Sequence, residues 1–223
     1  MRKIKILIIG LLVFLSLAYC SYTYGLPKWF PFNSENALKE WQEKIFKNRV
    51  LYIVKPEGEI TYLSAESKEA CSSLLYKIKF HPKTYPMISW KWKVSKFPDK
   101  DNNTKAQGGW LEKDDYAARV YIIFPSWIFF NIKCIEYIWD ESLPEGTIIT
   151  SPYSGNIRLI VAESGKKNIN KWVLEEKNIY EDYLKAFGAR PGYVGAIALM
   201  TDTDNTLSTA EAHYTNIKVR YKK

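Results

Sequence analysis

The sequence predicts an all-β protein, an antiparallel β-sandwich or jelly roll with one N-terminal helix and one short inserted helix. Short segments in which apolar and polar residues alternate recur along most of the chain, which is the pattern of half-buried strands. No regular alternation of strands and helices is visible, so a parallel α/β fold is not expected. Aromatic residues make up 15% of the chain, and large aromatics suit pleated surfaces.

The first segment of the chain predicts export. An apolar run over residues 4–18 follows Arg2, Lys3 and Lys5. A basic start, an apolar middle and small residues near its end form a signal peptide. The run has about 15 residues, fewer than the ~20 that span a bilayer comfortably. We therefore expect residues 1–18 to be removed and the protein to work in the periplasm or at the cell surface.

Two alternatives to simple secretion stay open. Residues 17–20 are similar to a lipoprotein signal in which Cys20 is acylated, although bulky Tyr19 occupies a position that normally takes a small residue. The leader can also remain uncleaved as an N-terminal membrane anchor. In each case membrane contact is expected only through the N-terminal segment.

The next segments predict a linker and a helix. Residues 19–33 contain Pro27 and Pro31 and are expected to be an extended linker before a single domain over residues 34–223. Residues 34–46 predict a helix that Ser34 caps. One face of this helix would be apolar, formed by Ala37, Leu38, Trp41, Ile45 and Phe46.

The first expected strands follow from residue 50. Residues 50–54 and 60–64 flank Pro-Glu-Gly at 56–58, which is typical of a hairpin. Residues 73–80 alternate clearly, and residues 87–94 form the strongest strand pattern of the chain. In the latter, one face carries four large apolar residues, which predicts a central core strand: Ile88, Trp90, Trp92 and Val94.

A polar segment at 96–112 is expected to be a long loop, of the kind that is often functional. The remaining expected strands bring the total to about nine to eleven, as in sandwiches and jelly rolls; they cover residues 115–124, 128–139, 157–163, 172–177, 194–201 and 213–221. The short inserted helix is expected at 180–187, ended by Gly188.

Charge and cysteine usage exclude several function classes. The formal net charge is +8, but no block of Lys or Arg occurs, so a nucleic-acid partner is not expected. No CxxC pair is present, and His81 and His213 are the only histidines, so a zinc site is not expected. Cys71 and Cys134 lie on expected strands and form either a disulfide or two buried free thiols.

A polar cluster at 114–119 is the first candidate site. Asp114 and Asp115 come just before a strand on which Arg119 lies, and a neighbouring strand brings Lys91 toward them. An acid beside an Arg makes either a structural ion pair or a polar binding surface. The ligand-binding residues expected on this surface are Lys91, Asp115, Arg119, Tyr121 and Trp139.

A second polar cluster follows the strand at 194–201. Asp202, Asp204 and Asn205 supply oxygen ligands of the kind that Ca²⁺ prefers, so calcium is the one cofactor considered. The same pattern is also an ordinary turn, because Asp and Asn side chains bond to nearby backbone. If the protein is an enzyme, Asp114 or Asp115 together with Asp202 or Asp204 would be its paired carboxylates.

These clusters carry a resemblance to a known family. The sequence resembles an exported bacterial family catalogued only as a domain of unknown function, over roughly residues 40–221. The resemblance implies a single β-sandwich similar to galactose-binding-like modules, and it implies no established activity. It rests on WKW within residues 88–94, DDYAARVY at 114–121, YIW at 137–139, NIYEDY at 178–183 and MTDTDNT at 200–206.

Together these observations predict a non-catalytic exported β-sandwich that binds a glycan or another cell-envelope component on a polar sheet face. One alternative is a polysaccharide hydrolase or lyase that uses paired carboxylates. The other is a structural or assembly protein of the envelope, which would present an exposed apolar patch.

Overall fold

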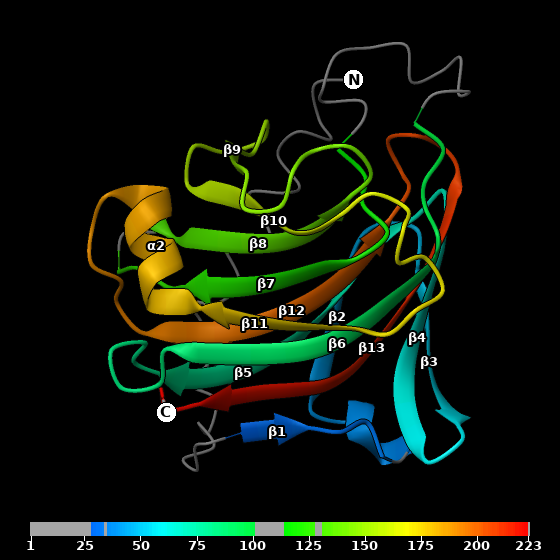
Figure 1. The fold of residues 1–223 in the computed structure, drawn as a ribbon, viewed down its shortest axis with the longest axis horizontal. Helices are drawn as coiled ribbons and strands as arrows, with labels where there is room; N and C mark the ends of the chain where they lie inside the picture. The colour runs from blue at the N-terminus through cyan, green and yellow to red at the C-terminus, as the bar shows by residue number, and fades with distance from the viewer. Residues whose placement is uncertain (1–27, 34, 101–113, 128–130, 223) are drawn as a thin grey trace.

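The computed structural model describes residues 28–33, 35–100, 114–127 and 131–222, and these residues form two stacked β-sheets (Figure 1). The expected leader over residues 1–18, Cys20 and most of the expected loop at 96–112 lie outside the described residues. Within the described ranges, no helix has the length and apolar character needed to cross a membrane.

One sheet has six strands and the other has seven. The six-stranded sheet has the order β11 (Val173–Asn178), β6 (Met87–Lys96), β13 (Thr209–Arg220), β4 (Ile60–Lys68) and β3 (Leu51–Glu57), with β1 (Lys28–Phe30) paired to β13. The seven-stranded sheet has the order β2 (Trp41–Lys47), β5 (Cys71–Phe80), β12 (Val194–Asp202), β7 (Arg119–Phe124), β8 (Lys133–Asp140), β10 (Ile157–Ser164) and β9 (Ile148–Thr150). The expected β-sandwich is confirmed.

Large aromatic side chains fill the space between the sheets. Trp90 and Trp92 of β6 contact the β8 side chains Tyr137 and Trp139, with ring centroids 5.3 and 5.8 Å apart. All four side chains are fully buried. Because alternate residues of a strand point to opposite faces, this core also fixes which residues face away from it.

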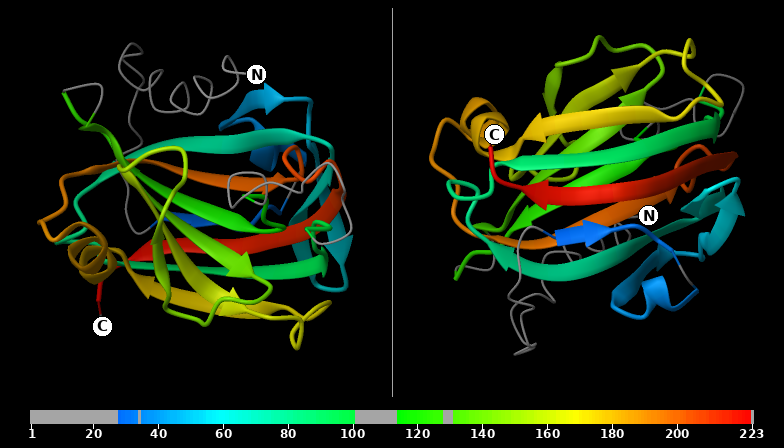
Figure 2. Two further views of the ribbon diagram at one scale, coloured as in Figure 1. Left: turned by 90° about the horizontal axis from the view of Figure 1, so that it is seen from above. Right: turned by 60° about the horizontal axis from the view of Figure 1, so that its bottom comes forward.

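The short inserted helix is confirmed as α2 (Ile179–Phe187), which lies at one end of the sandwich (Figure 2). The Asn178 side chain caps it by accepting hydrogen bonds from the Tyr180 and Glu181 amides, both at 3.2 Å. It ends at Gly188, whose φ of 65° is a left-handed conformation that favours glycine.

The expected helix over residues 34–46 is wrong. A short 3-10 turn, η2 (Glu35–Leu38), precedes β2, which pairs antiparallel with β5 so that Trp41 lies opposite Tyr76. Helix propensity is a weak preference that tertiary pairing overrides. Here backbone bonds to β5 and burial of Trp41 against Phe30, Phe32 and Tyr76 replace the helix.

The sheet is also not antiparallel throughout. β10 runs parallel to β8, with Ile157 opposite Cys134, whereas the other strand pairs of the described residues are antiparallel. Two short strands, β1 and β9, were not expected. β1 lies within the segment expected to be a linker, so at least residues 28–30 of that segment pair with β13.

Candidate functional site

The candidate site lies on the outer face of the seven-stranded sheet, the face turned away from the six-stranded sheet. Val120 and Ile122 of β7 belong to the core between the sheets. Alternation therefore turns Arg119 and Tyr121 to the other side. Tyr121 packs there in a second buried apolar cluster that includes Ile138 and Leu159, so the outer face is itself largely buried.

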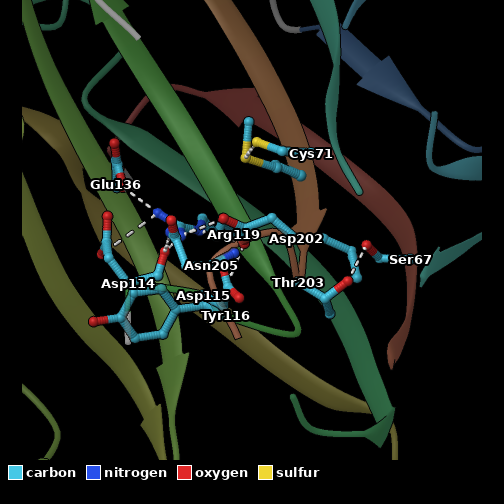
Figure 3. Close-up of polar contacts among 12 residues, drawn as sticks. Ser67, Cys71, Asp114, Asp115, Tyr116, Arg119, Glu136, Asp202, Thr203 and Asn205 are labelled. Carbon is cyan, nitrogen blue, oxygen red and sulfur yellow. Dashed lines mark hydrogen bonds and ion pairs between the residues drawn. The ribbon is translucent and has the colours of Figure 1, made fainter. Parts of the chain in front are cut away.

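Arg119 is the centre of this site (Figure 3). Its Nε and Nη2 donate to the two carboxylate oxygens of Asp202, at 2.9 and 2.6 Å. Nη1 donates to Glu136 Oε2 at 3.1 Å, and Nη2 also donates to the backbone carbonyl of Asp114 at 2.6 Å. Only 4% of Arg119 is exposed. The pair formed by Arg119 and Asp202 is bidentate, which is the strongest geometry for an arginine–carboxylate ion pair.

Burial alone would lower the pKa of Arg119, but Asp202 and the other acidic groups around it raise that pKa well above its usual value. Burial acts on the acids in the opposite sense, because it disfavours their ionised forms. It raises the pKa of Asp114 to about 6 and the pKa of Glu136 to about 7, although Arg119 opposes both shifts. The two carboxyl groups therefore change charge near neutral pH.

Asp114 lies at this site without a hydrogen bond to its Oδ1 atom. Oδ1 is buried, has no hydrogen-bond partner among the described residues and lies 4.0 Å from Arg119 Nη1. Since Glu136 Oε2 is 3.1 Å from the same Nη1, Asp114 Oδ1 and Glu136 Oε2 are at most about 7.1 Å apart. A buried acceptor without a partner is costly, so this atom marks a place where a ligand group can bind.

A small pocket opens over these groups, with a cavity volume of about 40 Å³, and it is partly open to solvent. Its lining combines the charged groups with aromatic and sulfur-containing side chains. The residues other than the four described above are Phe46, Cys71, Tyr121, Cys134, Ser151, Tyr153, Ile157, Met200, Asp204 and Asn205. Concave surfaces with a few polar groups among apolar walls are the usual form of small-ligand sites.

Asp115 has a structural role in this arrangement. It is fully buried, and its Oδ2 accepts from the Thr206 amide and the Thr206 hydroxyl, both at 2.7 Å. Its Oδ1 accepts from the Asn205 amide at 3.3 Å. The carboxylate therefore holds the turn after β12 against the segment before β7, and it is not among the residues that line the pocket.

Two of the expected ligand-binding residues lie elsewhere. Trp90 and Trp92 occupy the core, so Lys91 of β6 points to the outer face of the six-stranded sheet, across the sandwich from Arg119. Trp139 lies in the core between the sheets, where its Nε1 donates to the Gly165 carbonyl at 3.0 Å. The expected grouping of Lys91 and Trp139 with Arg119 and Tyr121 is therefore wrong.

The carboxylates expected to bind calcium are held by protein groups. Both Asp202 oxygens bind Arg119, and Oδ1 also accepts from the Tyr116 amide at 3.1 Å. Cys71, Asp202 and Asp204 do offer ligand atoms within 4.8 Å of one another. However, both carboxylate oxygens of Asp202 already accept hydrogen bonds from Arg119, so this residue is poorly suited to bind calcium. The side-chain Nδ2 atom of Asn205 donates to the Asp114 backbone carbonyl and to the Tyr153 hydroxyl group. Calcium binding stays a prediction.

Of the two alternatives for the cysteines, the disulfide is wrong and the pair of buried free thiols is confirmed. Cys71 lies on β5 and Cys134 on β8, and β12 and β7 separate these strands. Three strand spacings separate the two positions by at least about 14 Å, beyond the ~7 Å that a disulfide allows between Cα atoms.

Sequence reasoning missed Glu136, Tyr153 and Met200 as pocket residues. Glu136 offered a usable signal, since it is a lone acid inside the apolar strand 134–139. A buried acid on such a strand needs a partner. Tyr153 and Met200 carried no comparable signal, because tyrosine in a loop and methionine in a strand are common.

Solved structures of carbohydrate-active proteins give distant matches to this chain. The match to the Spr0440 glycoside hydrolase domain, Endo-D, from Streptococcus pneumoniae R6 has 11% identity and a TM-score of 0.40, and it covers 81% of this chain but only 21% of that one. The family 30 carbohydrate-binding module of a Clostridium thermocellum cellulase matches at 7% identity and a TM-score of 0.43, over 82% and 92% of the two chains. A cellulase derived from Cel12A of Rhodothermus marinus matches at 10% identity and a TM-score of 0.45, and the match covers 82% of this chain and 97% of that one.

These likenesses are too distant to say anything about the ligand. Among curated proteins, none matches the sequence significantly. The family comparison is decisive, because it covers most of the chain and includes all of the buried charged groups described above. Residues 39–218 match the family described as protein of unknown function, DUF3047, and the chain belongs to that family.

Proposed function

We propose that the protein is exported and binds a glycan in the pocket over Arg119. The observation that carries this proposal is Asp114 Oδ1, a buried carboxyl oxygen at the pocket that accepts no hydrogen bond from the described residues. A bound hydroxyl group would supply the missing donor and remove the cost of the unpaired acceptor.

The composition of the pocket agrees with a sugar. Glu136 and Asp114 accept hydrogen bonds from hydroxyl groups when ionised, and each can also donate one when protonated. Phe46 and Tyr153 supply aromatic surface to the same pocket, and such surface favours the apolar face of a sugar ring. A mixture of fixed carboxyl groups and aromatic walls suits a ligand that has polar edges and apolar faces.

The test is glycan binding by the purified protein and by an Asp114→Asn variant. This change keeps the shape of the side chain and replaces one oxygen with an amide. We expect it to lower the affinity for the best glycan of an array at least about tenfold, since hydrogen bonds to charged groups contribute about 1.5–3 kcal/mol. Glu59→Gln, an exposed change in the turn between β3 and β4, is the matched control and should leave the affinity unchanged.

Two results would contradict the proposal. One is a protein that folds normally and binds no glycan of a broad array. The other is an Asp114→Asn variant with the affinity of the unchanged protein, which would place the ligand somewhere other than this pocket.

A polysaccharide hydrolase is a second candidate function, and one specific observation favours it. Asp114 and Glu136 have pKa values of about 6 and about 7 and carboxyl oxygens at most about 7.1 Å apart. Two carboxyl groups that share a site with different protonation states are the arrangement used in glycoside hydrolysis. Asp115, expected as one member of such a pair, has its carboxylate committed to the turn after β12.

The enzyme and the binding protein differ in what Glu136→Gln does. If the protein hydrolyses its glycan, this variant should still bind the glycan but release reducing ends at least about 100-fold more slowly, the scale of a lost general acid. If the protein only binds, neither form releases reducing ends.

A further inference from the structure

The pocket over Arg119 has an excess of acidic groups. Four of the described residues that line it carry carboxyl groups, whereas Arg119 is the one cation among them. The four acids come from two strands and two connecting segments: Asp114, Glu136, Asp202 and Asp204. When all four are ionised, the guanidinium balances one of them.

The hydrogen bonds of Arg119 reach the carboxyl groups of two of these four acids, Asp202 and Glu136. A guanidinium has five N–H donors in a fixed plane. Nε and one Nη2 donor bind Asp202, the other Nη2 donor binds the Asp114 carbonyl, and Nη1 binds Glu136. Nη1 approaches Asp114 Oδ1 only to 4.0 Å, which is beyond hydrogen-bond distance. Between Arg119 and the Asp114 Oδ1 atom there is therefore charge attraction but no hydrogen bond.

Other charged groups near Asp114 do not line the pocket. Lys100 lowers the pKa of Asp114, but its Nζ lies 4.1 Å from the centre of the Tyr116 ring. Lys47 donates to the backbone carbonyl of Asp204 at 2.8 Å. Asp115 raises the pKa of Asp114 from behind the pocket. A positively charged group on the ligand would therefore meet carboxylates that no described lysine already pairs.

We propose that the ligand is an amine-bearing sugar whose ammonium group binds between Asp114 and Glu136. This inference rests on the proposed function, because it names the class of glycan that the same pocket takes. An ammonium nitrogen that donates at about 2.8 Å reaches two oxygens up to about 5.6 Å apart. The upper limit of 7.1 Å between Asp114 Oδ1 and Glu136 Oε2 includes such separations.

Charge explains why an amine is preferred to a hydroxyl group. A hydroxyl donates one hydrogen bond and leaves the acidic excess in place, whereas an ammonium group donates three and neutralises one carboxylate. Removing a charge from water is repaid when a partner charge and hydrogen bonds are both present. The acidic excess of the pocket offers a bound cation both a partner charge and hydrogen-bond acceptors. It offers a bound anion no spare positive charge, and its acidic groups repel an anion.

The experiment compares four probes on the full chain near pH 7: a glucosamine tetramer, an N-acetylglucosamine tetramer, cellotetraose and 1,5-diaminopentane. The first two differ in acetylation of the amine, which removes its charge. We expect the glucosamine tetramer to bind at least about tenfold more tightly than the two neutral tetramers. Asp114→Asn should abolish this preference, and Glu59→Gln should keep it. Thermal unfolding of both variants verifies that they are folded.

The outcomes separate this inference from the proposed function. Equal affinity for the glucosamine tetramer and cellotetraose would overturn the amine-bearing sugar while leaving a glycan site intact. A diamine that binds as tightly as the glucosamine tetramer would overturn the sugar, and with it the proposed function. Failure of all four probes to bind would overturn the inference directly. Retention of the preference in a folded Asp114→Asn variant would overturn the assigned position of the ammonium group.

Discussion

Arg119 is the single residue that makes the acidic outer face compatible with folding. It is buried, and its guanidinium binds Asp202, Glu136 and the backbone of Asp114. Removing one partner of a buried ionic group leaves uncompensated charges, which costs about 3–5 kcal/mol. The stabilisation therefore depends on the whole group of contacts.

We expect Arg119→Ala to lower the free energy of unfolding by about 3–5 kcal/mol, because it leaves the carboxylates of Asp202 and Glu136 buried without their cation. Urea unfolding followed by tryptophan fluorescence measures the change. Arg49→Ala is the matched control, since the Arg49 side chain is 72% exposed in its pair with Glu43 and surface pairs contribute little. A loss below about 1 kcal/mol for Arg119→Ala would contradict this account.

The raised pKa values of the acids predict a dependence of stability on pH. Burial raises the pKa of Glu136 to about 7, above the ~4.3 of an unfolded glutamate. Between these values the folded protein binds more protons than the unfolded chain, so stability falls as pH rises. The contribution of Glu136 is full below about pH 4 and is lost as pH rises through about 7.

Glu136→Gln should reduce the fall in unfolding free energy between pH 5 and pH 8 by roughly 2–3 kcal/mol, since one pKa unit corresponds to about 1.4 kcal/mol. The pH dependence of Glu136→Gln must be compared with that of the unchanged protein, because other groups also titrate in this range. Burial lowers the pKa of His213 to about 4, so His213 makes the free energy of unfolding rise as pH increases to about 6.5. Urea unfolding at several pH values provides the measurement. A variant with the same pH dependence as the unchanged protein would show that Glu136 is ionised throughout.

At the residue scale, the sequence identified part of the site. Asp114, Arg119 and Asp202 stood out because charged residues beside buried strands need partners. Glu136 did not, because its place beside Arg119 depends on the register in which it lies opposite Tyr121. Lys91 was assigned to the wrong surface, since period-two alternation tells which residues share a face but not which sheet that face belongs to.

At the scale of elements, close contact between β12 and the segment after β7 depends on one glycine. A Cβ atom on Gly195 would lie 2.8 Å from both Cδ and Cγ of Pro125. Gly195 also lies where the register of β12 against β5 shifts between Val194 and Ala196. The proline ring and the strand therefore have no room for a side chain.

Gly195→Ala should destabilise the protein by about 1–3 kcal/mol, the usual cost of overpacking. Gly192→Ala is the control, because a Cβ there meets nothing within 4 Å, and its effect should be near zero. Thermal unfolding of the two variants measures both. Equal melting temperatures for them would mean that the strand moves away from Pro125 at no cost.

Elements whose signals are local to the sequence could be predicted, and elements that depend on pairing with distant strands could not. α2 was predictable because its cap at Asn178 and its end at Gly188 are local to the sequence. β2 was not, because residues 34–46 carry an amphipathic spacing while the pairing of Trp41 with Tyr76 is set by a strand far along the chain. The parallel pair of β8 and β10 was missed for the same reason, since the connection between them contains the short strand β9 and not the helix that usually signals a parallel pair.

At the scale of the whole molecule, the central strands of the seven-stranded sheet are buried on both faces, whereas its edge strands β2 and β9 are partly exposed. All six residues of β7 and all nine of β12 are buried. One face packs on the six-stranded sheet, and the other holds the second apolar cluster together with Arg119 and its acids. The site is thus built into an apolar surface, where water screens charges weakly and the acidic groups keep their raised pKa values.

Export is the last prediction, and it concerns the chain as a whole. The basic and apolar residues at 2–18 predict a signal peptide, and the strands of the described fold begin at Lys28 of β1. We therefore expect cell fractionation to recover the protein from the periplasm or the cell surface. N-terminal sequencing of that protein should show that residues 1–18 have been removed. Deleting residues 2–18 should keep it in the cytoplasm with an unchanged melting temperature, because the strands of both described sheets lie within residues 28–220. Cys20→Ala distinguishes lipidation, since it should move an acylated protein from the membrane fraction to the soluble fraction. Full-length protein in the cytosol would contradict export while leaving the pocket over Arg119 intact.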